Sequence, residues 1–458
     1  MSAGKPRLTG DLSLTSVVLF GLAYISPGIV VTTFGVIAAT SGGAAPTAYA
    51  VATVAILLTG LSYAKMARVV PGAGSVYSYA RAMLGRRIGF LAGWAMLLDY
   101  FFIPMVGWLI QATYCEAQFP AVPRWVWLVL VVALTTGVNA FGMKLADRVN
   151  KVLMTVAIGS LALFAVLCVV YLGHHDTGPV TGAVWNSQSS VGAITAAAAV
   201  AAYSFLGFDA ISTLGEETKD STKTVSRGVI ACVVAAGAIF LVLSFILQLV
   251  HPGGRFADED AAAFAIKIMV GGRTYADIVN FISVAGGVAS CIALQASTAR
   301  LMYVMGRDGV LPRRVFGRLS PKLGTPVTGL LLTAAAGVIA MGLDLATATS
   351  FINFGAFLGF TLVNVSVVAW SIRERKEGRR HNLFTFIVLP LAGAAVSGYL
   401  LSRLGGTALV IGLVWLALGI LYLAVLTRGF RRPPPELSAV GREPVPAPED
   451  PPRTTAAA

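Results

Sequence analysis

Apolar residues occur in long runs along this chain, separated by short polar segments. Each run is about 20 residues long, the length that a helix needs to cross roughly 30 Å of hydrocarbon. The runs do not alternate with polar residues, which excludes an outer-membrane β-barrel. They predict an all-α integral membrane protein with twelve transmembrane helices, near residues 13–38, 46–68, 88–113, 124–142, 150–172, 191–215, 226–250, 275–304, 327–343, 347–371, 383–404 and 407–427.

Two of the runs are interrupted. The first contains YISPG at residues 24–28, and the sixth contains SFLGFD at residues 204–209. Proline removes a helical hydrogen bond, and glycine adopts torsions that end a helix. Because the breaks are in the first and sixth runs, the repeating unit would contain five helices, an odd number, and the second half would enter the membrane from the opposite face. Paired breaks in inverted halves indicate a transporter site, although a harmless kink at Pro27 and a close helix contact at Gly207 would leave the same pattern.

Unwound backbone inside a bilayer exposes amide and carbonyl groups that a bound solute can satisfy. Helix N-termini attract a carboxylate, and free carbonyl groups attract an ammonium. We therefore expect the breaks to bind substrate through Tyr24, Ser26, Pro27, Gly28 and Ile29 in the first run, and Tyr203, Ser204, Phe205, Leu206 and Gly207 in the sixth.

Acidic residues also occur inside the apolar runs. Asp99 stands in the middle of the third run, and Asp209 follows the break in the sixth. Charges at this depth are costly and indicate function, so either carboxylate could bind a substrate ammonium or carry a coupling proton. The structural alternative is a helix cap or a hydrogen bond to a neighbouring Tyr or Ser. Aromatic residues that could enclose an amine by cation–π contact, or simply pack in the core, are Trp94, Phe101, Phe102 and Phe208.

Composition and charge agree with the membrane class. The chain is 56% hydrophobic and 12% charged, against about 25% charged residues in soluble proteins. In a soluble protein, the net charge of +13 would suggest nucleic-acid binding. If the N-terminus is cytoplasmic, however, 29 of the 34 Lys and Arg residues fall in segments on the inside of the membrane, as the positive-inside rule requires. The five outside are Arg124, Arg255, Lys267, Arg273 and Arg403.

This asymmetry predicts a multi-pass protein of a bacterial cytoplasmic membrane, with both termini in the cytoplasm and no nucleic-acid partner. Four cysteines within or beside the runs, and four histidines without ligand spacing, indicate no disulfide, metal site or cofactor. Residues 71–85 are expected to form a short interfacial or re-entrant helix, or an ordinary loop. Glu216 and Glu217 could pair with Lys219 or Arg81 as a gate, or stand in a solvated loop.

The chain divides into three parts on these grounds. They are a cytoplasmic segment (1–12), a membrane domain (13–427) and a cytoplasmic tail (428–458), whose Pro- and Ala-rich sequence past Arg432 predicts disorder. Within the membrane domain we expect inverted repeats at about 13–172 and 191–371, followed by extra helices over 383–427.

Six segments carry a family resemblance. They are GLAYISPGIVVTTFG (21–35), AGSVYSYA (73–80), GFLAGWAMLLDYFFIPM (89–105), SFLGFDAISTLGEET (204–218), RLMYVMGRDGVLPRRVFG (300–317) and INFGAF (352–357). From about Leu12 to Leu426 the chain resembles the amino acid/polyamine/organocation permeases. The resemblance implies a five-plus-five inverted repeat with discontinuous helices 1 and 6, two extra C-terminal helices, and substrate between spans 1, 3, 6, 8 and 10. It places Tyr100 and Asn353 at the substrate and Asp209 in an acidic position used by polyamine carriers.

Two departures from the family pattern affect the substrate and the coupling. Polyamine importers carry an Asp in span 1 where this chain has Thr32, so one anchor for a dication is missing. Several amino acid carriers hold a proton on a Lys in span 5, where this chain has Ala157. Both a diamine and an amino acid therefore stay open as substrates.

The sequence favours a secondary active transporter that imports putrescine, a related polyamine or an amino acid by alternating access with proton coupling. An amino acid permease or exchanger of the same fold is the first alternative. A solute receptor that does not transport is an alternative of another class. A membrane enzyme would need a catalytic constellation at depth, but no His lies inside a run, and a channel would need a continuous polar lining.

Overall fold

The computed structural model describes residues 13–70, 76–141, 144–175, 179–218, 221–307, 309–320 and 325–434. The predicted N-terminal segment 1–12 and the tail beyond residue 434 lie outside this part. Within the described residues every regular element is helical and there is no β-strand. The all-helical fold predicted from the apolar runs is therefore confirmed.

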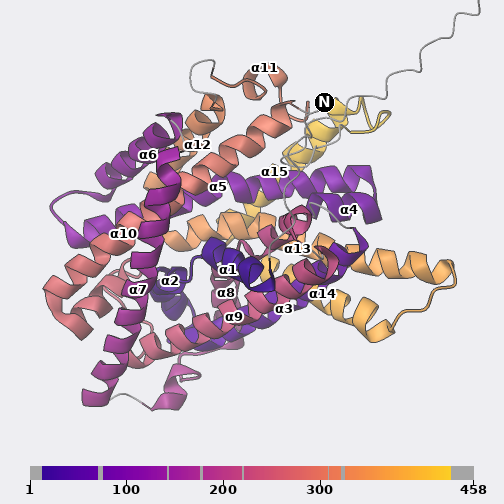
Figure 1. Ribbon diagram of the computed structural model, residues 1–458. Helices are drawn as coiled ribbons and strands as arrows, with labels where there is room; N and C mark the ends of the chain where they lie inside the picture. Colours follow the sequence, from indigo (N-terminus) through magenta and orange to yellow (C-terminus); the bar gives the residue numbers. More distant parts are fainter. Residues whose placement is uncertain are drawn as a thin grey trace, which may run out of the picture.

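In the described part of the chain, helices follow one another with short connections (Figure 1). They are α1 (Leu14–Ile25), α2 (Ile29–Thr40), α3 (Ala45–Val69), α4 (Val76–Leu84), α5 (Arg86–Gln118), α6 (Arg124–Phe141), α7 (Lys144–His174), η1 (Val180–Ala183), α8 (Val191–Ala201), η2 (Ala202–Phe205), η3 (Phe208–Glu217), α9 (Ser221–Val250), α10 (Ala262–Arg307), α11 (Arg313–Phe316), α12 (Val327–Ile339), η4 (Ala340–Gly342), α13 (Leu345–Lys376), the π-helical η5 (Phe384–Val388), α14 (Leu389–Ser402) and α15 (Gly406–Leu426).

Seven helices in the described part are long and apolar enough to cross a membrane. They are α3, α5, α9, α10, α13, η5 with α14, and α15. Five shorter apolar helices, at Ile29–Thr40, Arg124–Ala140, Ile158–His174, Val191–Phe205 and Val327–Gly342, coincide with the first, fourth, fifth, sixth and ninth predicted spans. The first and sixth are short because the helix is broken there.

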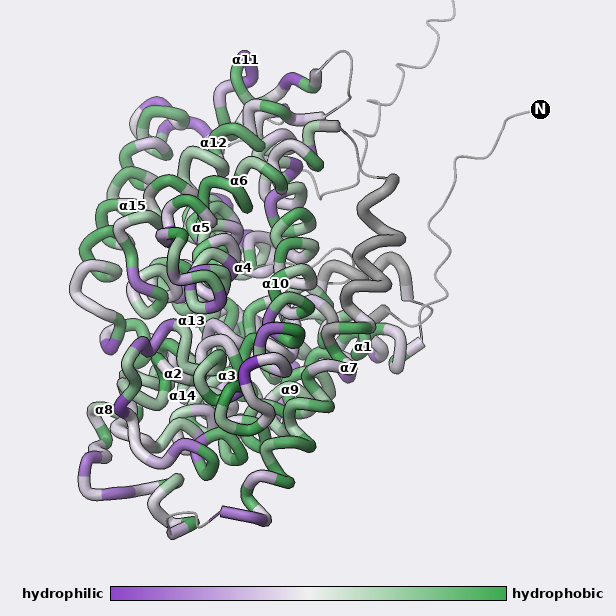
Figure 2. Tube along the Cα trace, turned by 90° about the vertical axis from the view of Figure 1, so that its left-hand side faces the viewer, coloured by the Kyte–Doolittle hydropathy of each residue, from purple (hydrophilic) through white to green (hydrophobic). Residues whose placement is uncertain are grey.

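The helices pack as one bundle. Helix α3 lies along α9, α13 lies along α5, and α1 packs against α9 and η3. Apolar residues cover the helices, and hydrophilic residues gather at their ends and in loops such as that at α11 (Figure 2). Helix α2 is largely buried, whereas α1 lies at one side of the bundle (Figure 2) and exposes Leu19 and Phe20.

Three local features refine the predicted elements. Within residues 71–85 the structure has the nine-residue helix α4, which packs on α5 and α13. Helix α10 is kinked at Gly272, whose φ of 76° separates residues 262–271 from the long second part. Residues 428–434, assigned to the tail, form turns against α5, where Arg87 Nη2 donates to Phe430 O at 2.6 Å.

Candidate functional site

The first break is a short non-helical segment between α1 and α2. Helix α1 ends at Ile25, and Ser26 adopts a left-handed conformation with φ 57°. Pro27 and Gly28 follow, and α2 begins at Ile29. A left-handed torsion is unfavourable for a residue with a side chain, so the surrounding packing must hold Ser26 in place.

The second break begins where α8 tightens into the 3₁₀ turn η2. Leu206 is extended, and Gly207 has a φ of 110° before η3 begins. A Cβ atom on Gly207 would lie 2.4 Å from Cδ1 of Tyr24. Glycine is thus required here both for its torsion and for the close approach of the first break. The two breaks are therefore in direct contact.

Two buried polar residues on other helices hold the broken segments. Tyr49 on α3 has its hydroxyl 3.1 Å from Thr33 Oγ1 and 3.2 Å from Ser204 Oγ, which ties α2 to η2. Asn353 on α13 donates through Nδ2 to the carbonyl of Ala199 at 2.7 Å. A carbonyl near a helix end in an apolar interior needs such a partner, so the side-chain amide of Asn353 stabilises the end of α8.

A cavity of about 420 Å³ opens beside both breaks, within the size range of small-molecule sites. It is bounded by α1, α2, α5, α7, η2 and α10. On α5 its lining runs from Ile103 to Tyr114, and on the second part of α10 from Val279 to Ser297. The cavity therefore occupies the half of the bundle that contains the C-terminal end of α5.

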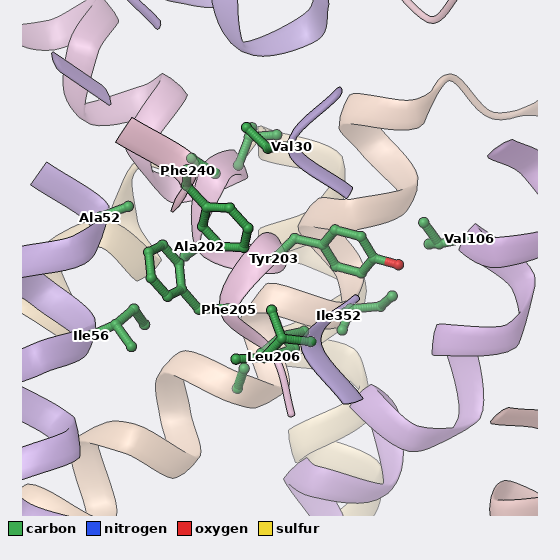
Figure 3. Close-up of a cluster of buried hydrophobic side chains, with 14 of the residues drawn as sticks. Val30, Ala52, Ile56, Val106, Ala202, Tyr203, Phe205, Leu206, Phe240 and Ile352 are labelled. Carbon is green, nitrogen blue, oxygen red and sulfur yellow. The ribbon is translucent and has the colours of Figure 1, made fainter. Parts of the chain in front are cut away.

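The predicted substrate residues divide into two groups. Those that line the cavity are Tyr24, Ser26, Pro27, Gly28, Ile29, Tyr203 and Leu206. Those outside its lining are Asp99, Tyr100, Ser204, Phe205, Gly207, Phe208 and Asn353. Figure 3 shows the reason at η2, where Tyr203 points toward Val106 of α5 and Phe205 points the other way, toward Ala52 and Ile56 of α3.

Asp99 is buried and is not among the residues that line the cavity. Its side chain is 7% exposed, and Oδ1 has no hydrogen-bond partner among the described residues. Asp209 is close enough to interact with Asp99 electrostatically, and both act on Tyr24. Tyr24 lines the cavity, so this ring stands where the cavity meets the carboxylate pair.

Aromatic rings close the bundle around the carboxylates. Tyr63 packs edge-on against Tyr79, Phe208 and Phe360, with ring centroids 5.9, 5.3 and 6.3 Å apart. Tyr63 also interacts electrostatically with both Asp99 and Asp209. None of these four aromatic residues is among those that line the cavity.

The backbone of Tyr100 and the ring of Trp94 have structural contacts. Thr298 on α10 donates to Tyr100 O at 2.6 Å. Trp94 stacks on Trp415 of α15 at 4.8 Å, and each indole N–H donates to the backbone carbonyl of the other residue at 2.9 Å. Trp94 therefore packs between helices, the alternative considered for it. The side chains of the predicted gate residues Glu216 and Glu217 lie outside the described part.

Several lining residues were missed by sequence reasoning. Gln111 on α5, opposite Gly287 of α10, is an uncharged polar residue in an apolar run and could have been found by that signal. Lys267 was placed with the outside residues, where a charge is normally solvated. The structure instead buries it to 3% exposure in the cavity wall, and nothing in the sequence separates it from a loop lysine.

Comparison with known proteins agrees with this architecture. The family model described as amino acid permease matches residues 12–427. The chain belongs to the amino acid permease family. The resemblance predicted from the six segments is thereby confirmed, and this permease is a multi-pass membrane protein whose relatives carry small molecules.

Three relatives show the range of the family. The permease is 38% identical to the low-affinity putrescine importer PlaP of Escherichia coli over 96% of this chain and 98% of PlaP. It is 26% identical to the branched-chain amino acid permease BcaP of Bacillus subtilis, over 93% and 95% of the two chains. It is 27% identical to the methylthioribose transporter of the same organism, over 92% and 94%.

Proposed function

We propose that this permease is a secondary importer that carries a small amine-bearing solute by alternating access, with proton coupling. The observation that carries the proposal is the cavity bounded by both helix breaks, beside the buried Asp99 and the half-buried Asp209. Broken helices at the middle of the bilayer are the usual place of substrate in secondary transporters. The family membership and the putrescine importer among the relatives support the same conclusion.

The proposed topology has twelve spans, with inverted halves at about 13–172 and 191–371 and both termini in the cytoplasm. The distribution of Lys and Arg supports this orientation. Under it, the cavity lies in the outer half of the bilayer, because α5 would run from the cytoplasm at Arg86 to the outside at Gln118. The cavity is then the outward pathway, and the Tyr63 aromatic cluster is the closed inner side.

Asp99 and Asp209 are the proposed proton and ammonium sites. A substrate ammonium or a proton would neutralise a buried carboxylate whose unpaired oxygen is otherwise costly. Tyr24 stands between them and the cavity, so a movement of this ring would admit the solute. Transfer of the solute to the carboxylates would then accompany opening of the inner aromatic cluster.

Uptake into proteoliposomes with an imposed pH gradient tests this function. The panel is labelled putrescine, cadaverine, spermidine, and neutral, basic and ω-amino acids. We expect accumulation of at least one of them that requires the gradient and is abolished by a protonophore. If no amine accumulates, the importer function is wrong. Saturable binding without uptake would instead support the solute receptor, the alternative from another class.

A further inference from the structure

The cavity contains a single charged side chain among its described lining residues, Lys267. It belongs to residues 262–271, the part of α10 before the kink at Gly272. Its side chain is 3% exposed, and Nζ lies 5.5 Å from the centroid of the Tyr114 ring. Lysine is rarely buried to this extent unless it is paired, so the partner of this ammonium needs an explanation.

No residue in the described part supplies that partner. Lys267 has neither a hydrogen bond nor an ion pair there. The first carboxylate before it in sequence and the first one after it have other contacts: Asp260 faces Arg124 at 3.7 Å, and Asp277 pairs with Arg273 at 3.1 Å. Tyr114, which lies under the ammonium, donates its own hydroxyl proton to Thr32 O at 3.3 Å. The lysine therefore presents an unneutralised positive charge in the cavity wall.

An unpaired cation in the wall changes which solutes fit. A carboxylate on the solute would neutralise Lys267 and form a charge-assisted hydrogen bond. A second ammonium at the same end would be repelled in a medium of low dielectric constant. Negative charge is also close to the cavity, because Asp99 and Asp209 interact electrostatically with Tyr24, another of its lining residues. A solute with one ammonium and one carboxylate would match both kinds of charge.

We propose that Lys267 binds the carboxylate of the transported solute, so that this permease selects amino acids over diamines. The proposal rests on the importer function and specifies its substrate class. Thr32 agrees with it, because this position in the cavity wall has an uncharged hydroxyl, which donates to Ile29 O at 3.0 Å. The described lining of the cavity therefore includes one positively charged side chain and no negatively charged one.

The sharpest test compares putrescine with 4-aminobutyrate, which has the same four-carbon spacing with one ammonium replaced by a carboxylate. Binding and uptake of both are measured for the wild type and for Lys267→Gln, together with α-amino acids as a further arm. We expect the wild type to prefer an amino acid. Lys267→Gln should lower the affinity for amino acids roughly 10- to 100-fold, because one hydrogen bond to a charged group is lost. The affinity for putrescine should not fall.

Two further variants separate charge recognition from folding. Lys267→Arg keeps the charge and should keep the preference for amino acids. Arg273→Gln removes a positive charge from the same helix at a side chain that pairs with Asp277 outside the cavity lining, and should leave the preference unchanged. Thermal stability in detergent is recorded for each variant, so that loss of folded protein is not read as loss of recognition.

The outcomes are distinct. A wild-type preference for putrescine over every amino acid, or an equal effect of Lys267→Gln on both solute classes, overturns the role of Lys267 and leaves the importer function standing. Failure of the wild type to bind or take up any amine overturns the importer function, and the role of Lys267 with it.

Discussion

Single residues define the contact between the two broken helices. Gly207 and Tyr24 meet so closely that no larger residue fits at position 207 without displacing the ring. Sequence reasoning found both residues, but from the break pattern alone and not from their mutual contact. It expected Phe205 and Asn353 at the substrate as well, whereas Phe205 packs against Phe240 at 4.9 Å and Asn353 supports the end of α8.

Gly207→Ala is predicted to destabilise the protein by about 1–3 kcal/mol, because alanine is strained at a φ of 110°, and the added Cβ would displace Tyr24. Thermal unfolding in detergent measures the loss, and uptake should fall with it. Gly398→Ala on α14 is the matched control, since its Cβ meets no atom within 4 Å. Equal stability of the two variants would contradict the assigned role of Gly207.

Asp99→Asn is predicted to reduce proton-driven uptake by roughly tenfold or more, because the variant loses a charged hydrogen bond to the solute or a proton site. Folded protein should be retained, since the amide has nearly the same shape as the carboxyl group. Initial uptake rates across an imposed pH gradient measure the effect. Asp277→Asn serves as control, because Asp277 pairs with Arg273 away from the cavity lining. Normal gradient-driven uptake by Asp99→Asn would remove Asp99 from the mechanism.

Among the elements, the connection before α10 joins two parts of the bundle. Asp260 accepts a hydrogen bond from the N–H of Leu345, at the start of α13, at 3.3 Å and faces Arg124 at the start of α6 at 3.7 Å. Burial raises the pKa of Asp260 to about 6, with smaller contributions from Asp258 and Asp344, against the lowering by the Leu345 N–H and Arg124. The ionised form is thus disfavoured in the folded state.

Because the folded pKa is above the unfolded value, Asp260 contributes stability that is fully present below about pH 4 and is lost as the pH rises through about 6. We predict that Asp260→Asn flattens the decrease in thermal stability between pH 4 and pH 7. Melting temperatures of the wild type and the variant across this interval test it, with Glu259→Gln, on an exposed residue, as control. Parallel pH profiles for the wild type and Asp260→Asn would refute the assignment.

On the scale of the whole molecule, the proposed topology predicts that the cavity faces the outside of the membrane. Ser283 lines it from the second part of α10. In a cysteine-free background, Ser283→Cys should react with a membrane-impermeant thiol reagent from the outside, and a transported amine should slow the reaction. Ser244→Cys, on α9 and 0% exposed, should not react. Labelling of Ser283→Cys from the cytoplasmic side alone would reverse the proposed orientation.

The sequence by itself determined the membrane class, the approximate helix positions, the two breaks and the family. These properties follow from runs of apolar residues and from Pro and Gly at local positions, which a linear chain displays directly. Tertiary structure decided which side chains reach the cavity, because neighbouring residues of a turn point in opposite directions, as Tyr203 and Phe205 do. It also buried Lys267 in the cavity wall, since only the folding of residues 262–271 against Tyr114 takes this charge out of water.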